Sequence, residues 1–370
     1  MTRLLFDALG LDANPSGTRT RIVRLVPALL DRGFDVTVAH RPELDGGARR
    51  ALGAARLLAV RHPPARNPLA RLLVQRSMYR RFLSTERPDV VIAETWPMPD
   101  CPGLVPVIHD LRYLELRRHL RRIFVQMLSR ASQRAVRVHV ASETIGKELV
   151  GTGVVDPEKV DVVPGIVTLP DVELLAAQPS PRSRPYVLVV GHAEQRKDYA
   201  LVHAVAGHLR PLGLDVVAVG RSVAEGASTG YRAGGAGSVT SRRGHDASGD
   251  VHNVGIVSDD ELERLYVHAR AVLAPSRYEG FGLVPLEALA AGAWVVASDI
   301  PVHREVLGEA ASYFGPGNVD DALARLRAAV AASNGVRQEQ ARAGRERAAR
   351  FSAARAAACF ERSLQAAGRA

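Results

Sequence analysis

The feature that most constrains this chain is an alternation of short β-branched segments with helical patterns, which occurs twice. In the first half, four apolar runs predict strands: Val36–His40, Val90–Glu94, Val105–Asp110 and Val138–Ser142. The second half has the same pattern, with strands predicted at Tyr186–Gly191, Asp215–Gly220, Ala271–Ser276 and Trp294–Ser298. Strands that alternate with helices form parallel sheets covered on both faces. The sequence therefore predicts an α/β protein with two Rossmann-like domains.

A proline-rich segment separates the two halves of this pattern. Leu174–Pro185 contains three prolines, two arginines and two serines, a composition typical of a linker. The chain has 370 residues, which is more than a single core usually organises. We therefore predict a first domain over residues 1–173, a linker over 174–185 and a second domain over 186–350.

Cysteine content and apolar run lengths indicate a cytoplasmic protein. The two cysteines, Cys101 and Cys359, are far apart in sequence, which favours a reduced compartment. The N-terminal stretch reaches Asp7 too early for a secretory signal peptide. No apolar run attains the roughly 18 residues of a membrane span.

Positive charge is concentrated in the first half of the chain. The net charge is +10, and the segment Arg49–Arg137 alone contains eighteen arginines, no lysine and six acidic residues, for a net charge of +12. Solvated helix faces are one interpretation. Nucleic acid is not expected, because no aromatic-rich binding motif accompanies the arginines. Peripheral contact with anionic lipid is the other interpretation, because Leu111–Arg130 alternates apolar residues with arginine at helical spacing.

The segment Ser276–Gly292, "SRYEGFGLVPLEALAAG", carries two glutamates around a Gly-Phe-Gly turn. We expect a helix from Leu283 to Gly292, with Pro285 tolerated in its first turn. The glycines allow the backbone to approach a ligand closely, and the free N–H groups of a helix N-terminus attract anions such as a diphosphate. Glu287, within the helix, suits the vicinal hydroxyls of a ribose, and Glu279 suits the hydroxyls of a sugar.

This segment and its context resemble glycosyltransferase family 4, the retaining nucleotide-sugar enzymes of GT-B fold. The resemblance extends over most of the chain and rests on the motifs "NPSGTRTRIVRLVPALLDRGFDVTV", "VIHDL", "KVDVVPGIV", "YVLVVGHAEQRKD", "VHNVGIVSDDELERLYVHARAVLAPS", "PSRYEGFGLVPLEALAAGAWVVASD" and "FSAARAAACFERSL". It implies two Rossmann-like domains facing each other across a cleft, with the acceptor bound by the first and the donor by the second. It also implies that residues 351–370 form a helix that crosses back to the first domain.

The resemblance assigns roles to particular positions. The residues that it implies for catalysis are His109, near the reacting carbon and acceptor, Glu279, and the diphosphate-binding cations Arg196 and Lys197. The residues that it implies for donor binding are Gly17, Arg19, His192, Ile256, Val257, Gly280, Phe281, Gly282, Leu283 and Glu287. Among these, Ile256 and Val257 match the backbone positions that read the base. Phe281 and Gly282 match the amides that face the transferred sugar.

Three positions depart from the family pattern. His192 stands where arginine is usual, and it is uncharged for much of the time near pH 7. Arg19 stands where the second glycine of the first loop is usual, while Gly17 keeps the first. Gly165 stands where asparagine is common. We interpret Arg19 either as a replacement for the missing cation or as a ligand for an anionic acceptor.

The sequence thus favours a retaining transferase that moves a mannosyl or related hexosyl group from a GDP-, UDP- or dTDP-sugar to a hydroxyl acceptor. That acceptor is a saccharide, a lipid-linked saccharide or a natural product. No metal or other cofactor is expected, because fixed cations can stabilise the diphosphate and no Asp-x-Asp motif follows a strand. Two alternatives remain: a GT-B epimerase or hydrolase of sugar nucleotides, and a nucleotide-sugar-binding protein with a decayed site. The expected location is the cytoplasm, with peripheral attachment to the inner face of a membrane as a further possibility.

Overall fold

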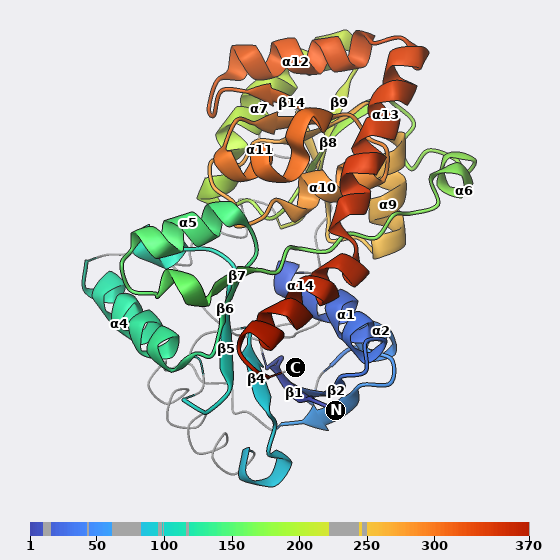
Figure 1. Ribbon diagram of the computed structural model, residues 1–370. Coiled ribbons are helices and arrows are strands. Elements are labelled where there is room, and N and C mark those ends of the chain that lie inside the picture. Colours follow the sequence, from blue (N-terminus) through green and yellow to red (C-terminus); the bar gives the residue numbers. More distant parts are fainter. Residues whose placement is uncertain are drawn as a thin grey trace. The chain divides into compact units, whose positions relative to one another are not determined.

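A computed structural model describes most of the chain (Figure 1). The described residues are 1–9, 16–42, 44–60, 83–94, 98, 100–115, 118–221, 244–245 and 250–369. They divide into two compact units. The first comprises Met1–Ile166 together with Ser352–Ala370, and the second consists of the described residues between Val167 and Phe351.

The first unit is built on a seven-stranded parallel sheet in the order β3-β2-β1-β4-β5-β6-β7. Its strands are β1 (Arg3–Asp7), β2 (Asp35–His40), β3 (Arg56–Ala59), β4 (Val90–Ala93), β5 (Leu104–Ile108), β6 (Val138–Val140) and β7 (Val160–Val162). The four strands predicted for this half are present, each with ends shifted by a few residues. The sheet also has three strands that the β-branched pattern does not predict, because β1 and β3 are rich in leucine and β7 is a short Val-Asp-Val.

Helices flank this sheet and complete its core. They are α1 (Gly17–Leu30), α2 (Gly46–Ala51), α4 (Arg118–Arg134), α5 (Glu143–Gly151) and α14 (Ala353–Ala366), with short 3-10 turns at Arg112–Glu115 and Pro157–Lys159. The C-terminal helix α14 lies beside α1 (Figure 1). Its buried Phe360 stacks on Phe6 of β1 and meets Phe34 edge to face. The last helix of the chain is therefore part of the core formed by the first strands.

A buried polar network also holds α14 to the sheet. His139 on β6 lies 2.9 Å from the hydroxyl of Ser363, which donates to Asp161 on β7 at 2.6 Å. Arg137 donates to both oxygens of the same carboxylate. Burial, together with the nearby charge of Arg21, lowers the pKa of His139 to about 3, so the ring is neutral at physiological pH.

The second unit contains another seven-stranded sheet, in the order β10-β11-β9-β8-β12-β13-β14. Its strands are β8 (Tyr186–Val190), β9 (Asp215–Val219), β10 (Gly244–His245), β11 (Val251–Gly255), β12 (Ala271–Ala274), β13 (Val295–Ser298) and β14 (Ser312–Phe314). All neighbours are parallel except β10 and β11. The four strands predicted for this half are again present.

The helices of the second unit are α6 (Val172–Ala176), α7 (Tyr199–Leu209), α9 (Asp259–His268), α10 (Leu283–Ala290), α11 (Pro301–Leu307), α12 (Val319–Ala331) and α13 (Asn334–Ala348). Four 3-10 turns accompany them, at Gln195–Lys197, Arg210–Leu212, Gly308–Ala310 and Ala349–Phe351. Helix α10 begins at the predicted residue and ends two residues before the predicted Gly292, which has a φ of 74°. The left-handed backbone at this glycine follows the last helical turn.

The compact units divide at a different place from the predicted linker. The division falls between Ile166 and Val167, several residues before the predicted boundary at 173/174. Asp171 caps α6 through its side chain, and α6 packs against α9. Farther along, Arg264 of α9 donates to the carbonyl of Pro179. The first part of the proline-rich segment is therefore fixed to the second unit by helix packing and hydrogen bonds.

Candidate active site

The strand order of the second unit creates a site at one edge of its sheet. Strand β8 lies between β9 and β12, so the chain leaves β8 toward one side of the sheet and reaches β12 on the other. The loops that follow β8 and β12 diverge at this switch point, where parallel α/β sheets bind ligands. The residues that follow these two strands are Gly191–Asp198 and Pro275–Gly282.

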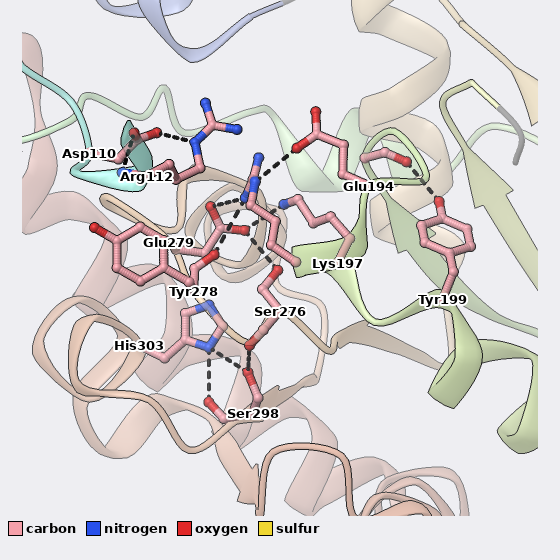
Figure 2. Close-up of polar contacts among 12 residues, drawn as sticks. Asp110, Arg112, Glu194, Lys197, Tyr199, Ser276, Tyr278, Glu279, Ser298 and His303 are labelled. Carbon is pink, nitrogen blue, oxygen red and sulfur yellow. Dashed lines mark hydrogen bonds and ion pairs between the residues drawn. The ribbon is translucent and has the colours of Figure 1, made fainter. Parts of the chain in front are cut away.

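Glycines allow the loop after β8 to pass close to its neighbour. Gly220, with a φ of 136°, follows β9, and a Cβ at this position would lie 2.4 Å from the carbonyl oxygen of Gly191. The hydroxyl of Tyr199 donates to the same carbonyl oxygen at 2.7 Å (Figure 2). These contacts fix the path of the loop that carries Arg196 and Lys197.

Three of the predicted catalytic residues meet in this site. Lys197 Nζ donates to Glu279 Oε1 at 2.5 Å, and Arg196 Nη1 lies 2.8 Å from Glu279 Oε2 (Figure 2). The backbone joins the two loops as well, because the N–H of Arg277 donates to the carbonyl of Arg196 at 2.8 Å. One carboxylate thus holds two cations, and the trio has a net charge of +1.

The ionisation of Glu279 follows from these contacts. Burial by itself would raise the pKa of this carboxyl, but the charges of Lys197 and Arg196 and the hydrogen bonds of Lys197 and Ser276 outweigh it and lower the pKa to about 2. Glu279 is therefore ionised at neutral pH.

A series of hydrogen bonds connects Glu279 to Ser276, Ser298 and His303. Ser276 donates its hydroxyl to Glu279 Oε1 at 2.7 Å, and the hydroxyl of Ser298 donates to the carbonyl of Ser276. His303 Nδ1 lies 2.9 Å from the carbonyl of Ser298, so the buried ring donates from this nitrogen (Figure 2). Burial lowers the pKa of His303, which keeps the ring neutral. A Cβ at residue 282 would lie 3.2 Å from Cδ2 of this ring, and the φ of 83° there also favours glycine.

The sequence pattern does not predict the hydrogen bonds that connect Glu279 to Ser276, Ser298 and His303. Ser276, Ser298 and His303 carry no charge pattern of their own, and their roles depend on which strands are neighbours. The available signal was that Ser276 and Ser298 both stand at the ends of predicted strands that belong to one parallel sheet. Arg277 was also missed: its guanidinium donates to the buried carboxylate of Asp198 at 2.9 Å.

The predicted Gly-Phe-Gly turn leads directly into α10. Gly282, the N-cap residue of the helix, has a φ of 83° and no side chain that could cap the first amide groups. Phe281 is buried and meets the ring of Phe351 edge to face. A small pocket lies beside the turn, lined by Lys197, Tyr199, Ser276 and the first turn of α10 at Val284 and Pro285, among others. Leu283 and Glu287 are half-buried on α10.

The remaining donor-binding positions of the second unit follow β11 and β8. Ile256 and Val257 come directly after β11 and are half-buried. His192 Nδ1 accepts a hydrogen bond from the backbone N–H of Arg221 at 3.1 Å. Burial lowers the pKa of His192, and the charge of Arg221 lowers it further, so the ring is neutral at pH 7. His192 therefore does not replace the charge of an arginine at this position.

Gly17, Arg19 and His109 belong to the first unit. Gly17 is the first residue of α1, whose N-cap is Ser16. Arg19, in the same first turn, donates to both carboxylate oxygens of Asp45 at 3.1 and 3.0 Å. An anion at Arg19 would share the guanidinium with Asp45. His109 follows β5 and contacts Glu94, which follows the adjacent strand β4.

The described ranges contain neither a cluster of metal ligands nor a membrane-spanning helix. Within them, no three His, Cys, Asp or Glu side chains lie close enough to hold a metal ion together. Over the same part of the chain, no helix combines the length and apolar character needed to cross a membrane.

Two family descriptions cover most of the sequence. Residues 15–169 match Glycosyltransferase Family 4, and residues 173–347 match Glycosyl transferases group 1. The chain therefore belongs to the glycosyltransferases of family 4 and group 1. Among curated relatives, the O-antigen chain mannosyltransferase B of Escherichia coli is 41% identical over 78 residues, which is 21% of this chain and 20% of the relative. The match thus spans about a fifth of the relative's length.

Solved structures identify the fold of this glycosyltransferase. Sucrose-phosphate synthase from Thermosynechococcus elongatus superposes with a TM-score of 0.72 at 17% identity, covering 99% of this chain and 98% of the other. HepE from Anabaena, in complex with UDP and glucose, superposes with a TM-score of 0.71 at 16% identity, covering 99% of each chain. The fold is GT-B, as the sequence predicts.

The ion-paired trio makes a testable contribution to the stability of this glycosyltransferase. We expect Glu279→Gln to lower the free energy of unfolding at pH 7 by about 3–5 kcal/mol, because the largely buried Lys197 loses its counter-charge and Arg196 keeps only Glu194. Urea denaturation measures this change. The control is Glu194→Gln, which also removes a partner of Arg196 but at a side chain that is 43% exposed. There we expect about 0–1 kcal/mol. Equal losses in the two variants would contradict this account of the trio.

The same contribution depends on pH. The folded-state pKa of Glu279, about 2, lies below its ordinary value of 4.5. The stabilisation is therefore complete above pH 4.5 and is lost as the pH falls through about 2. The difference between wild type and Glu279→Gln should shrink in this window and stay constant above it.

Proposed function

We propose that this protein is a retaining, metal-independent hexosyltransferase that uses a nucleoside-diphosphate sugar. The observation that carries the proposal is the Lys197–Arg196–Glu279 trio at the switch point of the second sheet. It offers cations for a diphosphate, a carboxylate for sugar hydroxyls and a helix N-terminus in one place. A decayed site is not favoured, because the trio and its hydrogen-bonded support are intact. An epimerase or hydrolase is not favoured, because the Lys197 loop and the Glu279 turn resemble those of the transferases.

The donor in this proposal is a GDP-, UDP- or dTDP-sugar. A nucleotide donor agrees with the UDP in the HepE complex, and a mannosyl group agrees with the name of the O-antigen relative. Ile256 and Val257 would contact the base through their backbone. Glu287 would accept hydrogen bonds from the ribose hydroxyls, and the amides of Phe281 and Gly282 would face the transferred sugar. The acceptor is a hydroxyl of a saccharide, a lipid-linked saccharide or a natural product.

The chemistry in this proposal is displacement of the diphosphate. As the glycosidic bond breaks, negative charge grows on the leaving phosphate, and Lys197 and Arg196 stabilise it. Both have N–H groups beyond those that contact Glu279, because an ammonium has three donors and a guanidinium five. The departing phosphate accepts the proton of the incoming hydroxyl on the same face of the sugar. The anomeric configuration is then retained.

The direct test is a transfer assay with a panel of nucleotide sugars and hydroxyl acceptors. We expect a glycoside whose anomeric configuration equals that of the donor. NMR gives this configuration from the one-bond carbon–proton coupling constant at the anomeric carbon. A chelator should leave the rate unchanged. Inversion would reject front-face displacement, and a strict requirement for a divalent cation would reject the metal-independent mechanism.

Loss of Lys197 should affect turnover more than donor affinity. We expect Lys197→Ala to lower kcat on the order of 10²-fold, comparable with the loss of one oxyanion donor, because the leaving-group charge is largest in the transition state. Steady-state kinetics and calorimetric titration with the nucleoside diphosphate separate the two effects. Lys147→Ala removes a solvent-exposed lysine of α5 and is the matched control. A loss of affinity with kcat unchanged would mean that Lys197 binds the ground state and the transition state equally.

We further propose that the first unit attaches reversibly to an anionic membrane surface through α4. The first turns of this helix expose Arg118, Arg121 and Arg122. Beside these arginines, Leu120 and Ile123 are 43% and 53% exposed. Such exposure is unusual for large apolar side chains. Basic residues beside exposed apolar ones are typical of interfacial helices. Arg117, which also belongs to the predicted segment Leu111–Arg130, lies outside the described residues.

Vesicle co-sedimentation tests this attachment. Each arginine near an anionic surface contributes about 1 kcal/mol, so replacing Arg118, Arg121 and Arg122 with Gln should lower partitioning by roughly 10²-fold. Added salt should weaken the binding of the wild type. The control replaces Arg304, Arg325 and Arg342 with Gln, three well-exposed arginines of the second unit. Equal recovery of the wild type with anionic and neutral vesicles would refute the attachment.

A further inference from the structure

A buried carboxylate in the first unit lies between a buried cation and a partly exposed histidine. Glu94 follows β4, and its side chain is fully buried. Its Oε1 forms an ion pair with Arg21 of α1, which is also buried. Its Oε2 lies 2.9 Å from His109 Nε2, and the side chain of His109 is 28% exposed. The buried ion pair therefore contacts a ring that solvent and ligands can reach.

The charge of Glu94 determines which nitrogen of His109 carries the proton. Burial by itself would raise the pKa of Glu94, but Arg21 and His109 outweigh it and the pKa is lowered. An ionised carboxylate only accepts hydrogen bonds, so Nε2 of His109 must donate. The neutral ring then has its lone pair on Nδ1. Among the described residues, Nδ1 forms no hydrogen bond of its own.

We propose that Glu94, held by Arg21, is a positioning residue that fixes His109 with Nδ1 free to accept a hydrogen bond from a sugar hydroxyl. The inference rests on the proposed function, which supplies the hydroxyl-bearing ligand. Histidine has two tautomers, and only the one with a proton on Nε2 offers an acceptor at Nδ1. Glu94 selects this tautomer and holds the ring orientation.

The contact between Glu94 and His109 is not needed to balance the charge of Glu94. Arg21 by itself would provide the counter-charge for Glu94 in the core. Instead, the second carboxylate oxygen is directed to a partly exposed ring at the end of the adjacent strand, and β4 and β5 run parallel, so both residues stand at the same edge of the sheet. Among the described residues, other charged or titratable groups near this pair include His139 on β6, Asp110, the residue after His109, and the buried Asp7 of β1, which is in register with Ala93 of β4.

The tautomer can be measured without any activity assay. In protein labelled with ¹⁵N-histidine, long-range proton–nitrogen NMR spectra separate the two tautomers and the protonated ring. The signal of His109 is assigned by its loss in His109→Gln. We expect Nε2–H to predominate at pH 7.5 in the wild type. A predominant Nδ1–H form, or rapid averaging of the two nitrogens, would overturn the inference.

Two variants test the consequence for turnover. Glu94→Gln removes the charge but keeps an oxygen that can accept from Nε2. The double variant Arg21→Met/Glu94→Leu removes the whole ion pair, which avoids an unpaired charge in the core. We expect kcat to fall roughly 10- to 100-fold in the double variant, the range for losing a group that orients a functional histidine, and less in Glu94→Gln. Asp89→Asn, at the other end of β4, removes an exposed ion-paired carboxylate and serves as control.

The readouts distinguish the possible failures. Calorimetric titration with the nucleoside diphosphate should be unchanged in all three variants, since the proposed nucleotide site lies in the second unit. A double variant that folds and keeps the turnover of the wild type would overturn the proposed role of Glu94. A wild type that transfers no sugar would refute the proposed function, while the NMR result would still report on Glu94. If donor hydrolysis without acceptor falls together with transfer, the hydroxyl belongs to the donor sugar; if only transfer falls, it belongs to the acceptor.

Discussion

The candidate active site depends on the charge of one buried carboxylate. Glu279 stays ionised because Lys197 and Arg196 outweigh the cost of its burial, and both cations are held in turn by its two oxygens. The contact joins the loop after β8 to the loop after β12, which are separated by about eighty residues in sequence. Charge balance and loop conformation are therefore coupled. Arg196 also pairs with the more exposed Glu194, so the four side chains together are neutral.

Parallel topology explains why these loops can meet. In each sheet the first strand of the unit lies inside the sheet, with later strands added on both sides. The chain therefore diverges next to β8 and next to β1, and polar residues gather at the carboxyl ends of the neighbouring strands. In the second unit these are Lys197 and Glu279. In the first unit they are Glu94 and His109, which follow β4 and β5.

Much of this architecture could be predicted from local patterns, because buried parallel strands are apolar runs and the Gly-Phe-Gly turn precedes an obvious helix. The pairing of Glu279 with Lys197 agrees with the motif-based assignment of both to one site. Other features could not be found in this way. Glu94 follows a predicted strand but looks like an ordinary strand end, and its role depends on Arg21 and His109 being neighbours in space. The partner of Arg19, Asp45, likewise depends on how α1 and α2 pack.

The path of the chain between the units has a consequence for synthesis. The second unit is drawn from one stretch between Val167 and Phe351, whereas the first needs Ser352–Ala370 in addition to its N-terminal residues. Phe360 and Leu364 are fully buried in the core that includes Phe6. On the ribosome, the second unit can close its core while the first still lacks a helix. The first unit is therefore synthesised first but completes its fold last. Its exposed core face must be kept from aggregation until the final residues emerge.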